Sequence, residues 1–190
     1  MNLPNLLTVF RILLTPFFLL ALVLPFTGHF LVALVLFIVA SLTDYFDGRI
    51  ARDQHLITDF GKFLDPIADK MLTTAAFLGF MVLGLGWGAV WITFIVLTRE
   101  FLVASVRMIV AAKGTVLAAD MLGKTKTCVQ MGAIIAVLAI EGGLQLFPVL
   151  EVARLPLTIF YNLALWASVV FTAISGVNYV VGNKEALGLK

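Results

Sequence analysis

Four aspartates lie close together in the chain, two on each side of a short polar segment. Asp44 and Asp47 are three residues apart, and Asp65 and Asp69 are four apart. Residues three or four apart on an α-helix share a face, so each pair would place two carboxylates on one side of its helix. The short connection predicts that the two helices are antiparallel neighbours. Their acidic faces can therefore meet at one end of the pair.

Four neighbouring carboxylates need positive charge close by, because they repel one another and are costly beside hydrocarbon. The segment holds no cysteine, and its one histidine, His55, falls in the connecting loop. An all-oxygen site suits Mg²⁺, Mn²⁺ or Ca²⁺ rather than zinc. Four aspartates suffice for two ions, and paired ions are a recurring device for displacement at phosphorus. The alternative, a solvated helix–loop–helix surface, explains the regular spacing on both helices less well.

Two glycines and an arginine accompany the aspartates. Gly48 and Gly61 fall on the same helix faces as the carboxylates. Glycine within a helix costs about 1 kcal/mol relative to alanine, so a ligand or a facing helix is expected to approach closely there. Arg52 follows Gly48 by one turn. Its guanidinium can pair with a phosphate oxygen, or it can serve as a basic anchor at a membrane interface.

The composition predicts that these elements lie in a membrane. Hydrophobic residues make up 62% of the 190 residues and charged residues 13%, and the mean hydropathy is +1.09. Soluble domains are about 45–50% apolar. The net charge of +2 gives no reason to expect a nucleic acid partner, and the single cysteine, Cys128, excludes an intrachain disulfide. We expect one membrane domain over residues 1–190, without a second soluble domain.

Six segments have the roughly 20 apolar residues that a membrane helix needs. They cover residues 6–25, 30–52, 61–85, 89–112, 121–140 and 157–181, with turns at 26–29 and 84–88 and a loop containing glycine and proline that follows residue 140 and runs through 148–156. The fold class is therefore an all-α integral membrane protein with six transmembrane helices, the first being a retained span rather than a signal peptide.

Lysine and arginine are distributed unevenly between the two sides of this arrangement. The second-to-third and fourth-to-fifth connections and the C-terminal tail carry Arg49, Arg52, Lys62, Lys70, Arg107, Lys113, Lys124, Lys126, Lys184 and Lys190. Arg11 and Arg99 lie at a depth that assigns them to neither side, and the other side carries only Arg154. By the positive-inside rule, both termini are expected in the cytoplasm and the protein in the cell membrane.

The aspartate segment resembles the signature of the CDP-alcohol phosphatidyltransferases. The pattern D-x-x-D-G-x-x-A-R-x8-G-x-x-x-D-x-x-x-D is present without a departure, as Asp44, Asp47, Gly48, Ala51, Arg52, Gly61, Asp65 and Asp69. The resemblance implies an enzyme that transfers the phosphatidyl group of CDP-diacylglycerol to an alcohol and releases CMP. It also implies a homodimer.

The resemblance further implies the roles of individual residues. Two divalent cations, Mg²⁺ or Mn²⁺, would bind Asp44, Asp47, Asp65 and Asp69, while Gly48, Ala51, Arg52 and Gly61 would line the site of the CDP-lipid. Asp69 would be the catalytic base for the acceptor hydroxyl. A carboxylate beside a metal ion is a weak base and must act through its position. Whether Asp69 is base, ligand or both stays open.

Two further stretches bear on the acceptor. Residues 2–18 (NLPNLLTVFRILLTPFF) and 99–131, which include REFLVASVRMIVAAKG and LGKTKTCVQM, are similar to bacterial phosphatidylglycerophosphate synthases. This similarity implies sn-glycerol 3-phosphate as acceptor. A phosphorylated acceptor needs cationic and polar groups near the metal site, and the candidates are Asn5, Thr8, Arg11, Arg99, Arg107, Lys124 and Lys126. Arg99, about ten residues into its span, would be costly facing lipid and should have a partner or a function.

Two alternatives remain. The same chemistry could use serine, inositol phosphate or phosphatidylglycerol as acceptor. A different class, a divalent cation transporter, would place carboxylates near the membrane midplane. The aspartates here fall at the end of a helix pair and adjoin Arg52, which favours the enzyme.

Overall fold

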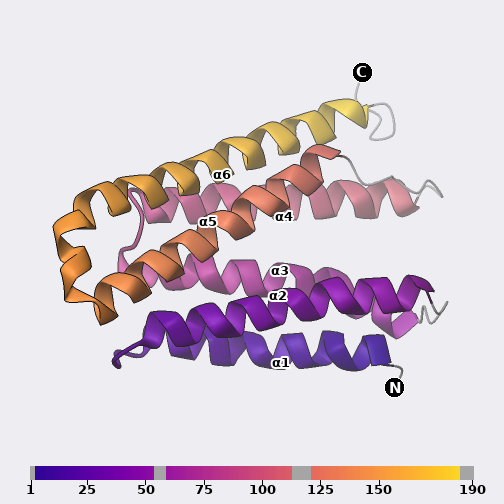
Figure 1. Ribbon diagram of the computed structural model, residues 1–190. Coiled ribbons are helices and arrows are strands. Elements are labelled where there is room, and N and C mark those ends of the chain that lie inside the picture. The colour runs from indigo at the N-terminus through magenta and orange to yellow at the C-terminus, as the bar shows by residue number, and fades with distance from the viewer. Residues whose placement is uncertain (1–2, 54–58, 113–120, 185–190) are drawn as a thin grey trace.

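The chain folds into a bundle of long helices (Figure 1). The computed structural model describes residues 3–53, 59–112 and 121–184. Within these ranges the side chains are described except those of Leu3, Pro4, residues 45–53, Asp59, Phe60, Lys62, Phe63, Asp65, Asp69 and Ala112. The described residues form helices α1 (Leu3–Val23), α2 (His29–Asp53), α3 (Asp59–Leu83), α4 (Ala89–Ala112), α5 (Met121–Leu146), the 3₁₀ helix η1 (Pro148–Ala153) and α6 (Arg154–Gly182), and no strands. The all-α prediction is confirmed.

The helices form two groups. Helix α1 packs against both α2 and α3, and α6 packs against both α4 and α5. Contacts of α2 with α5 and of α3 with α4 join the groups. The end of α2, the start of α3, the end of α4 and the start of α5 lie at one end of the bundle, together with the start of α1 and the end of α6 (Figure 1). We call this the aspartate end, and the other the opposite end.

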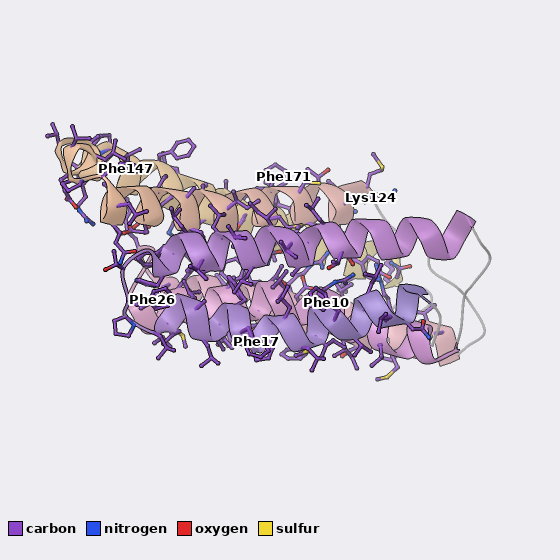
Figure 2. All side chains as sticks on the ribbon, turned by 60° about the horizontal axis from the view of Figure 1, so that its bottom comes forward. Phe10, Phe17, Phe26, Lys124, Phe147 and Phe171 are labelled. Atoms are coloured by element: carbon purple, nitrogen blue, oxygen red, sulfur yellow. The ribbon has the colours of Figure 1, made fainter. Side chains whose placement is uncertain are left out.

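The exterior of the bundle is apolar as well as its core. Phe18, Leu22, Phe37 and Phe80 are buried in the main core, and other large apolar side chains, Phe17 among them, lie on the outer surface (Figure 2). Helices that are apolar all round are typical of membrane proteins. The bundle is therefore that of a multi-pass membrane protein.

Among the described residues, five segments are long and apolar enough to cross a membrane: Asn5–Val23, Pro66–Leu83, Ala89–Ala111, Met121–Leu146 and Pro148–Gly182. In helix α2 the part whose side chains are described, His29–Asp44, is apolar but shorter. The six predicted helices are all present, and five of them meet the requirements for a span by length and composition.

Glycines shape both predicted turns at the opposite end. Gly28 has a φ of 83°, and Gly84, Gly86 and Gly88 have φ values of 67°, 95° and 69°. Such left-handed conformations are accessible to glycine at little cost. A side chain on Gly86 would also meet Leu165, because a Cβ atom would lie 2.9 Å from its Cδ1.

The predicted end of the fifth helix at residue 140 is wrong, since α5 continues to Leu146. Gly142 does not break the helix but allows α2 to approach it. A Cβ atom there would lie 2.5 Å from Cδ2 of Leu31. The loop expected over 148–156 is also wrong, because η1 and the first turn of α6 occupy that stretch.

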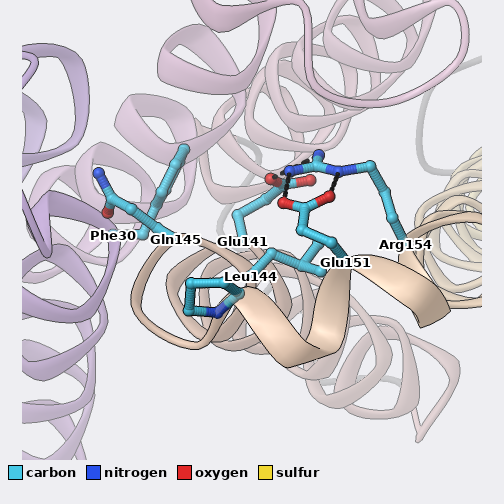
Figure 3. Close-up of a pocket in the computed structure, with 7 residues that line it drawn as sticks. Phe30, Glu141, Leu144, Gln145, Glu151 and Arg154 are labelled. Atoms are coloured by element: carbon cyan, nitrogen blue, oxygen red, sulfur yellow. Dashed lines mark hydrogen bonds and ion pairs between the residues drawn. The ribbon is translucent and has the colours of Figure 1, made fainter.

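Polar contacts fasten the opposite end. The Gln145 amide donates to the Phe26 carbonyl (3.2 Å), and its oxygen accepts from the Gly28 N–H (3.1 Å), so α5 holds the turn between α1 and α2. Arg154 donates to both oxygens of Glu151, at 2.6 and 2.7 Å, and lies 3.9 Å from Glu141 (Figure 3). These groups line a cavity of about 380 Å³. The basic residue expected on this side is thus engaged in ion pairs.

The close approach of α2 and α5 makes Gly142 sensitive to substitution. We expect Gly142→Ala to destabilise the protein by about 1–3 kcal/mol, because Leu31 must move. Gly132 lies in the same helix with nothing within 4 Å of an added Cβ, so Gly132→Ala should be neutral or stabilise by about 0.5–1 kcal/mol. Equilibrium unfolding in detergent measures both. Equal effects of the two variants would contradict the packing role of Gly142.

Candidate functional site

The aspartate motif lies on two continuous helices. The backbone is α-helical from Asp44 to the end of α2, and from Gly61 through Asp69 in α3. The predicted three- and four-residue spacings are therefore helical repeats, which place each aspartate pair on one side of its helix. Helices α2 and α3 contact each other, and α1 packs along both. The backbone thus brings the two halves of the motif to one end of the bundle.

Asp44 is the one aspartate of the four whose side chain the structure describes. The side chains of Asp47, Ala51, Arg52, Asp65 and Asp69, and the surroundings of Gly48, lie outside the described part. Among the described side chains no group of three or more histidine, cysteine or acidic residues could hold a metal ion. The four-aspartate metal site and the CDP-lipid site accordingly stay predictions. Gly61, which is described, is buried.

Arg11 of α1 forms an ion pair with Asp44 of α2. Nη1 of Arg11 lies 2.5 Å from Oδ1 of Asp44, and the arginine side chain is 2% exposed while that of the aspartate is 51% exposed. A buried guanidinium is costly unless it is paired. Asn5 and Thr8 are also buried, so the polar face expected on the first helix exists. It adjoins the first aspartate of the motif.

A second charged cluster surrounds Glu100 of α4. The Glu100 carboxylate, 15% exposed, accepts a hydrogen bond from Nζ of Lys126 in α5. Nη1 of Arg99 lies 3.2 Å from the same carboxylate, and Nζ of Lys70 in α3 lies 3.9 Å from it. Lys70 also donates to the Glu100 carbonyl at 3.3 Å. Three helices therefore meet at the Glu100 carboxylate, and the α3 member, Lys70, is the residue that follows Asp69 in the chain.

The expectation that Arg99 has partners is confirmed. Adjacent residues on a helix point in different directions, yet the long side chains of Arg99 and Glu100 reach each other. Nη2 of Arg99 donates to Oγ of Ser175 in α6 (2.7 Å). Gly176 makes room for this arginine, because a Cβ there would lie 2.8 Å from its Cγ. Arg99 thus ties α4 to α6.

The remaining acceptor candidates are distributed along the same helices. Arg107, two turns beyond Arg99 on α4, donates to the Tyr179 hydroxyl (3.2 Å) and lies 5.6 Å from the centre of that ring. Lys124 is exposed at the aspartate end of α5 (Figure 2). Cys128, also on α5, is exposed. The structure brings Arg99 and Lys126 together around Glu100, whereas Asn5, Thr8 and Arg11 form a separate group on α1.

The sequence analysis missed the partners of these cations. Glu100 joins three of them, and α6 contributes Ser175 and Tyr179. A signal was present in α6, where buried polar residues recur every three or four positions: Ser168, Thr172, Ser175 and Tyr179. Such a polar stripe in an apolar helix marks the side that faces other helices.

The bundle is apolar, and it holds a buried cationic cluster beside a helix pair that carries carboxylates. These features define a multi-pass membrane protein with a polar site at one end. Comparison with known proteins shows which family it belongs to. The family model for CDP-alcohol phosphatidyltransferase matches residues 1–174. The chain belongs to the CDP-alcohol phosphatidyltransferase family.

Individual relatives are similar over most of their length. The chain is 41% identical to a CDP-diacylglycerol–glycerol-3-phosphate 3-phosphatidyltransferase of Bacillus subtilis, over 98% of this chain and 97% of the relative. It is 40% identical to a probable phosphatidylglycerophosphate synthase of Mycobacterium tuberculosis, over 98% and 84%. A relative from Wigglesworthia glossinidia brevipalpis, with the same name as the Bacillus protein, is 37% identical over 73% and 77%. These relatives confirm the family resemblance.

The Glu100 cluster predicts a strong dependence of stability on one carboxylate. Glu100→Gln leaves Arg99, Lys126 and Lys70 without their shared counter-charge, and removing one partner of a buried ion pair costs about 3–5 kcal/mol. Equilibrium unfolding in detergent should show this loss. The control is Glu151→Gln, which removes a carboxylate from an exposed pair with Arg154 and should leave the melting temperature nearly unchanged. Similar losses in both variants would contradict the role of Glu100.

Proposed function

We propose that the protein transfers the phosphatidyl group of CDP-diacylglycerol to sn-glycerol 3-phosphate, giving phosphatidylglycerol phosphate and CMP. The observation that carries this proposal is the complete aspartate motif on two adjoining helices of a family member. Relatives about 40% identical over nearly the whole chain, whose names specify this reaction or its product, support the choice of acceptor.

The proposal includes a membrane arrangement. Six helices cross the cell membrane, with both termini and the aspartate end in the cytoplasm. In support, most lysines and arginines of the sequence fall in segments that belong to the aspartate end, and the polar aspartate motif at the end of α2 would reach the interface there. The family resemblance supports a homodimer surrounded by membrane lipids.

Two divalent cations, Mg²⁺ or Mn²⁺, are the cofactors that we propose for Asp44, Asp47, Asp65 and Asp69. The donor set fits, because hard cations prefer carboxylate oxygens. Asp44 is half-exposed and therefore accessible to an ion while Arg11 contacts one of its oxygens. When bound, such ions neutralise the pyrophosphate and stabilise the charge that develops on the departing CMP.

The protein groups would position the reactants. Gly48, Ala51, Arg52 and Gly61 would line the site of the CDP-lipid, with the guanidinium on a phosphate oxygen. Asp69 would accept the proton of the acceptor's primary hydroxyl. The oxygen of that hydroxyl bonds at the same time to the phosphorus that carries diacylglycerol. The bond from this phosphorus to the CMP oxygen breaks in the same displacement. Arg11 would hold Asp44 in place through their ion pair.

The acceptor phosphate would bind among the cations of α4 and α5. Arg99, Lys126 and Lys70 surround a single carboxylate, so this cluster keeps a net positive charge that attracts a phosphate. Arg107 and Lys124, nearer the aspartate end, would add to the field that draws the anion in. Asn5, Thr8 and Arg11 on α1, which are apart from this cluster, would contribute polar groups from the side of Asp44.

The test of the acceptor is CMP release by the purified protein in detergent. With CDP-diacylglycerol, sn-glycerol 3-phosphate and Mg²⁺ or Mn²⁺, we expect CMP and a phosphorylated lipid. Serine, inositol phosphate and phosphatidylglycerol should release little CMP. If the protein preferred one of these, that compound would replace the proposed acceptor. If no CMP were released with any acceptor and either ion, the proposed enzyme activity would be refuted.

The metal site predicts the effect of one aspartate. Asp65→Asn removes a charged ligand without changing size, and turnover should fall by at least about 10³-fold, in line with the loss of an essential electrostatic group. The control is Asp53→Asn, at the end of α2 and outside the motif, which should retain activity. Asp65→Asn should still be extracted from the membrane by detergent and migrate as a folded protein. Activity of Asp65→Asn close to that of the unaltered protein would rule out this metal site.

A further inference from the structure

Gln130 of α5 and Thr172 of α6 are buried polar residues with unused hydrogen-bonding groups. Their exposed fractions are 1% and 0%. Nε2 of Gln130 and Oγ1 of Thr172 have no hydrogen-bond partner among the described residues. A buried polar group without a partner costs about 1–3 kcal/mol, and such groups in native proteins are normally satisfied. A bound molecule is therefore expected to reach them.

Both residues lie one helical turn from the cationic cluster. Gln130 follows Lys126 by four residues on α5, and Thr172 precedes Ser175 by three residues on α6. Arg99 and Glu100 join Lys126 to Ser175, so these two residues lie at the same level of the bundle. Helices α5 and α6 run antiparallel and pack together. The step from Lys126 to Gln130 and the step from Ser175 to Thr172 therefore both lead one turn away from the aspartate end, and Gln130 and Thr172 lie at a common level of the bundle.

Arg99 supplies a third unused group, within the cationic cluster itself. Its Nε is buried and has no partner in the part of the chain that the structure describes, although both Nη atoms are hydrogen-bonded. The unused groups are thus an amide donor, a hydroxyl and a guanidinium N–H, contributed by three helices that meet at the cluster. They suit a small molecule that carries an anionic group next to a neutral hydroxyl.

The neighbouring Ser168 shows that the unused groups are specific to these positions. Ser168 is also fully buried on α6, one turn further from the cluster than Thr172. Its hydroxyl, however, donates to the carbonyl of Leu165 at 2.7 Å. A polar side chain in this helix can therefore satisfy itself locally, and Thr172 does not do so.

We propose that Gln130 and Thr172 bind the secondary (C2) hydroxyl of the acceptor and thereby set its specificity. This inference rests on the proposed function, in which the acceptor phosphate lies at Arg99 and Lys126. One helical turn is about 5.4 Å, a scale that suits the separation between that phosphate and the C2 hydroxyl. The primary hydroxyl stays available for transfer. Gln130 and Thr172 are specificity-determining residues and take no part in proton transfer.

The test compares sn-glycerol 3-phosphate with 3-hydroxypropyl phosphate, which keeps the phosphate and the primary hydroxyl but lacks the C2 hydroxyl. The unaltered protein should favour the glycerol compound by about tenfold or more in kcat/KM, since a site built for a hydroxyl rejects an analogue without it. Gln130→Leu and Thr172→Val should bring this preference close to unity. Thr172→Ser, which keeps the hydroxyl, and the control Ser168→Ala should preserve it.

The outcomes separate this inference from the proposed function. If Gln130→Leu and Thr172→Val lowered kcat/KM equally for both acceptors, the inference would be overturned and these residues would be assigned to packing. The inference would also be overturned if the unaltered protein used both acceptors with the same kcat/KM, whatever the variants show. If the unaltered protein released no CMP with either acceptor, the proposed function would fail instead.

Discussion

The bundle depends on a single carboxylate that holds positive charge in an apolar surrounding. Glu100 contacts Arg99, Lys126 and Lys70 from α4, α5 and α3, and Arg99 extends the network to α6 through Ser175. Charge beside hydrocarbon is tolerated only when it is paired. Four helices are thus fixed relative to one another by one acidic residue. Because three cations share it, the cluster remains positive and can receive a phosphate.

A similar pairing organises the other half of the bundle. Arg11 is almost completely buried and reaches Asp44 from α1, and α1 is the helix that packs along both α2 and α3. The first aspartate of the motif is therefore positioned by a neighbouring helix as well as by its own. This arrangement explains why a basic residue in the first span accompanies an acidic motif in the next two helices.

Features that depend on local sequence could be predicted. The four-residue repeat of Asp65 and Asp69 predicted a helix, and α3 is one. Features that depend on contacts between distant residues could not. Gly142 was expected to lie beyond a helix end, but its lack of a side chain serves the approach of Leu31, which no local pattern reveals. The partners of Arg99 were equally hidden, since Glu100 reaches it by side-chain length and Ser175 belongs to a helix 76 positions away in the chain.

The position of Cys128 has a practical consequence. It is the single cysteine of the chain, it is exposed, and it lies on α5 two residues after Lys126 and two before Gln130. Residues two apart on a helix point to opposite sides, so a fluorophore or spin label attached to this thiol would sit on the back of the helix that carries both. The protein therefore contains a natural attachment point for spectroscopic observation of α5, with no other thiol to remove.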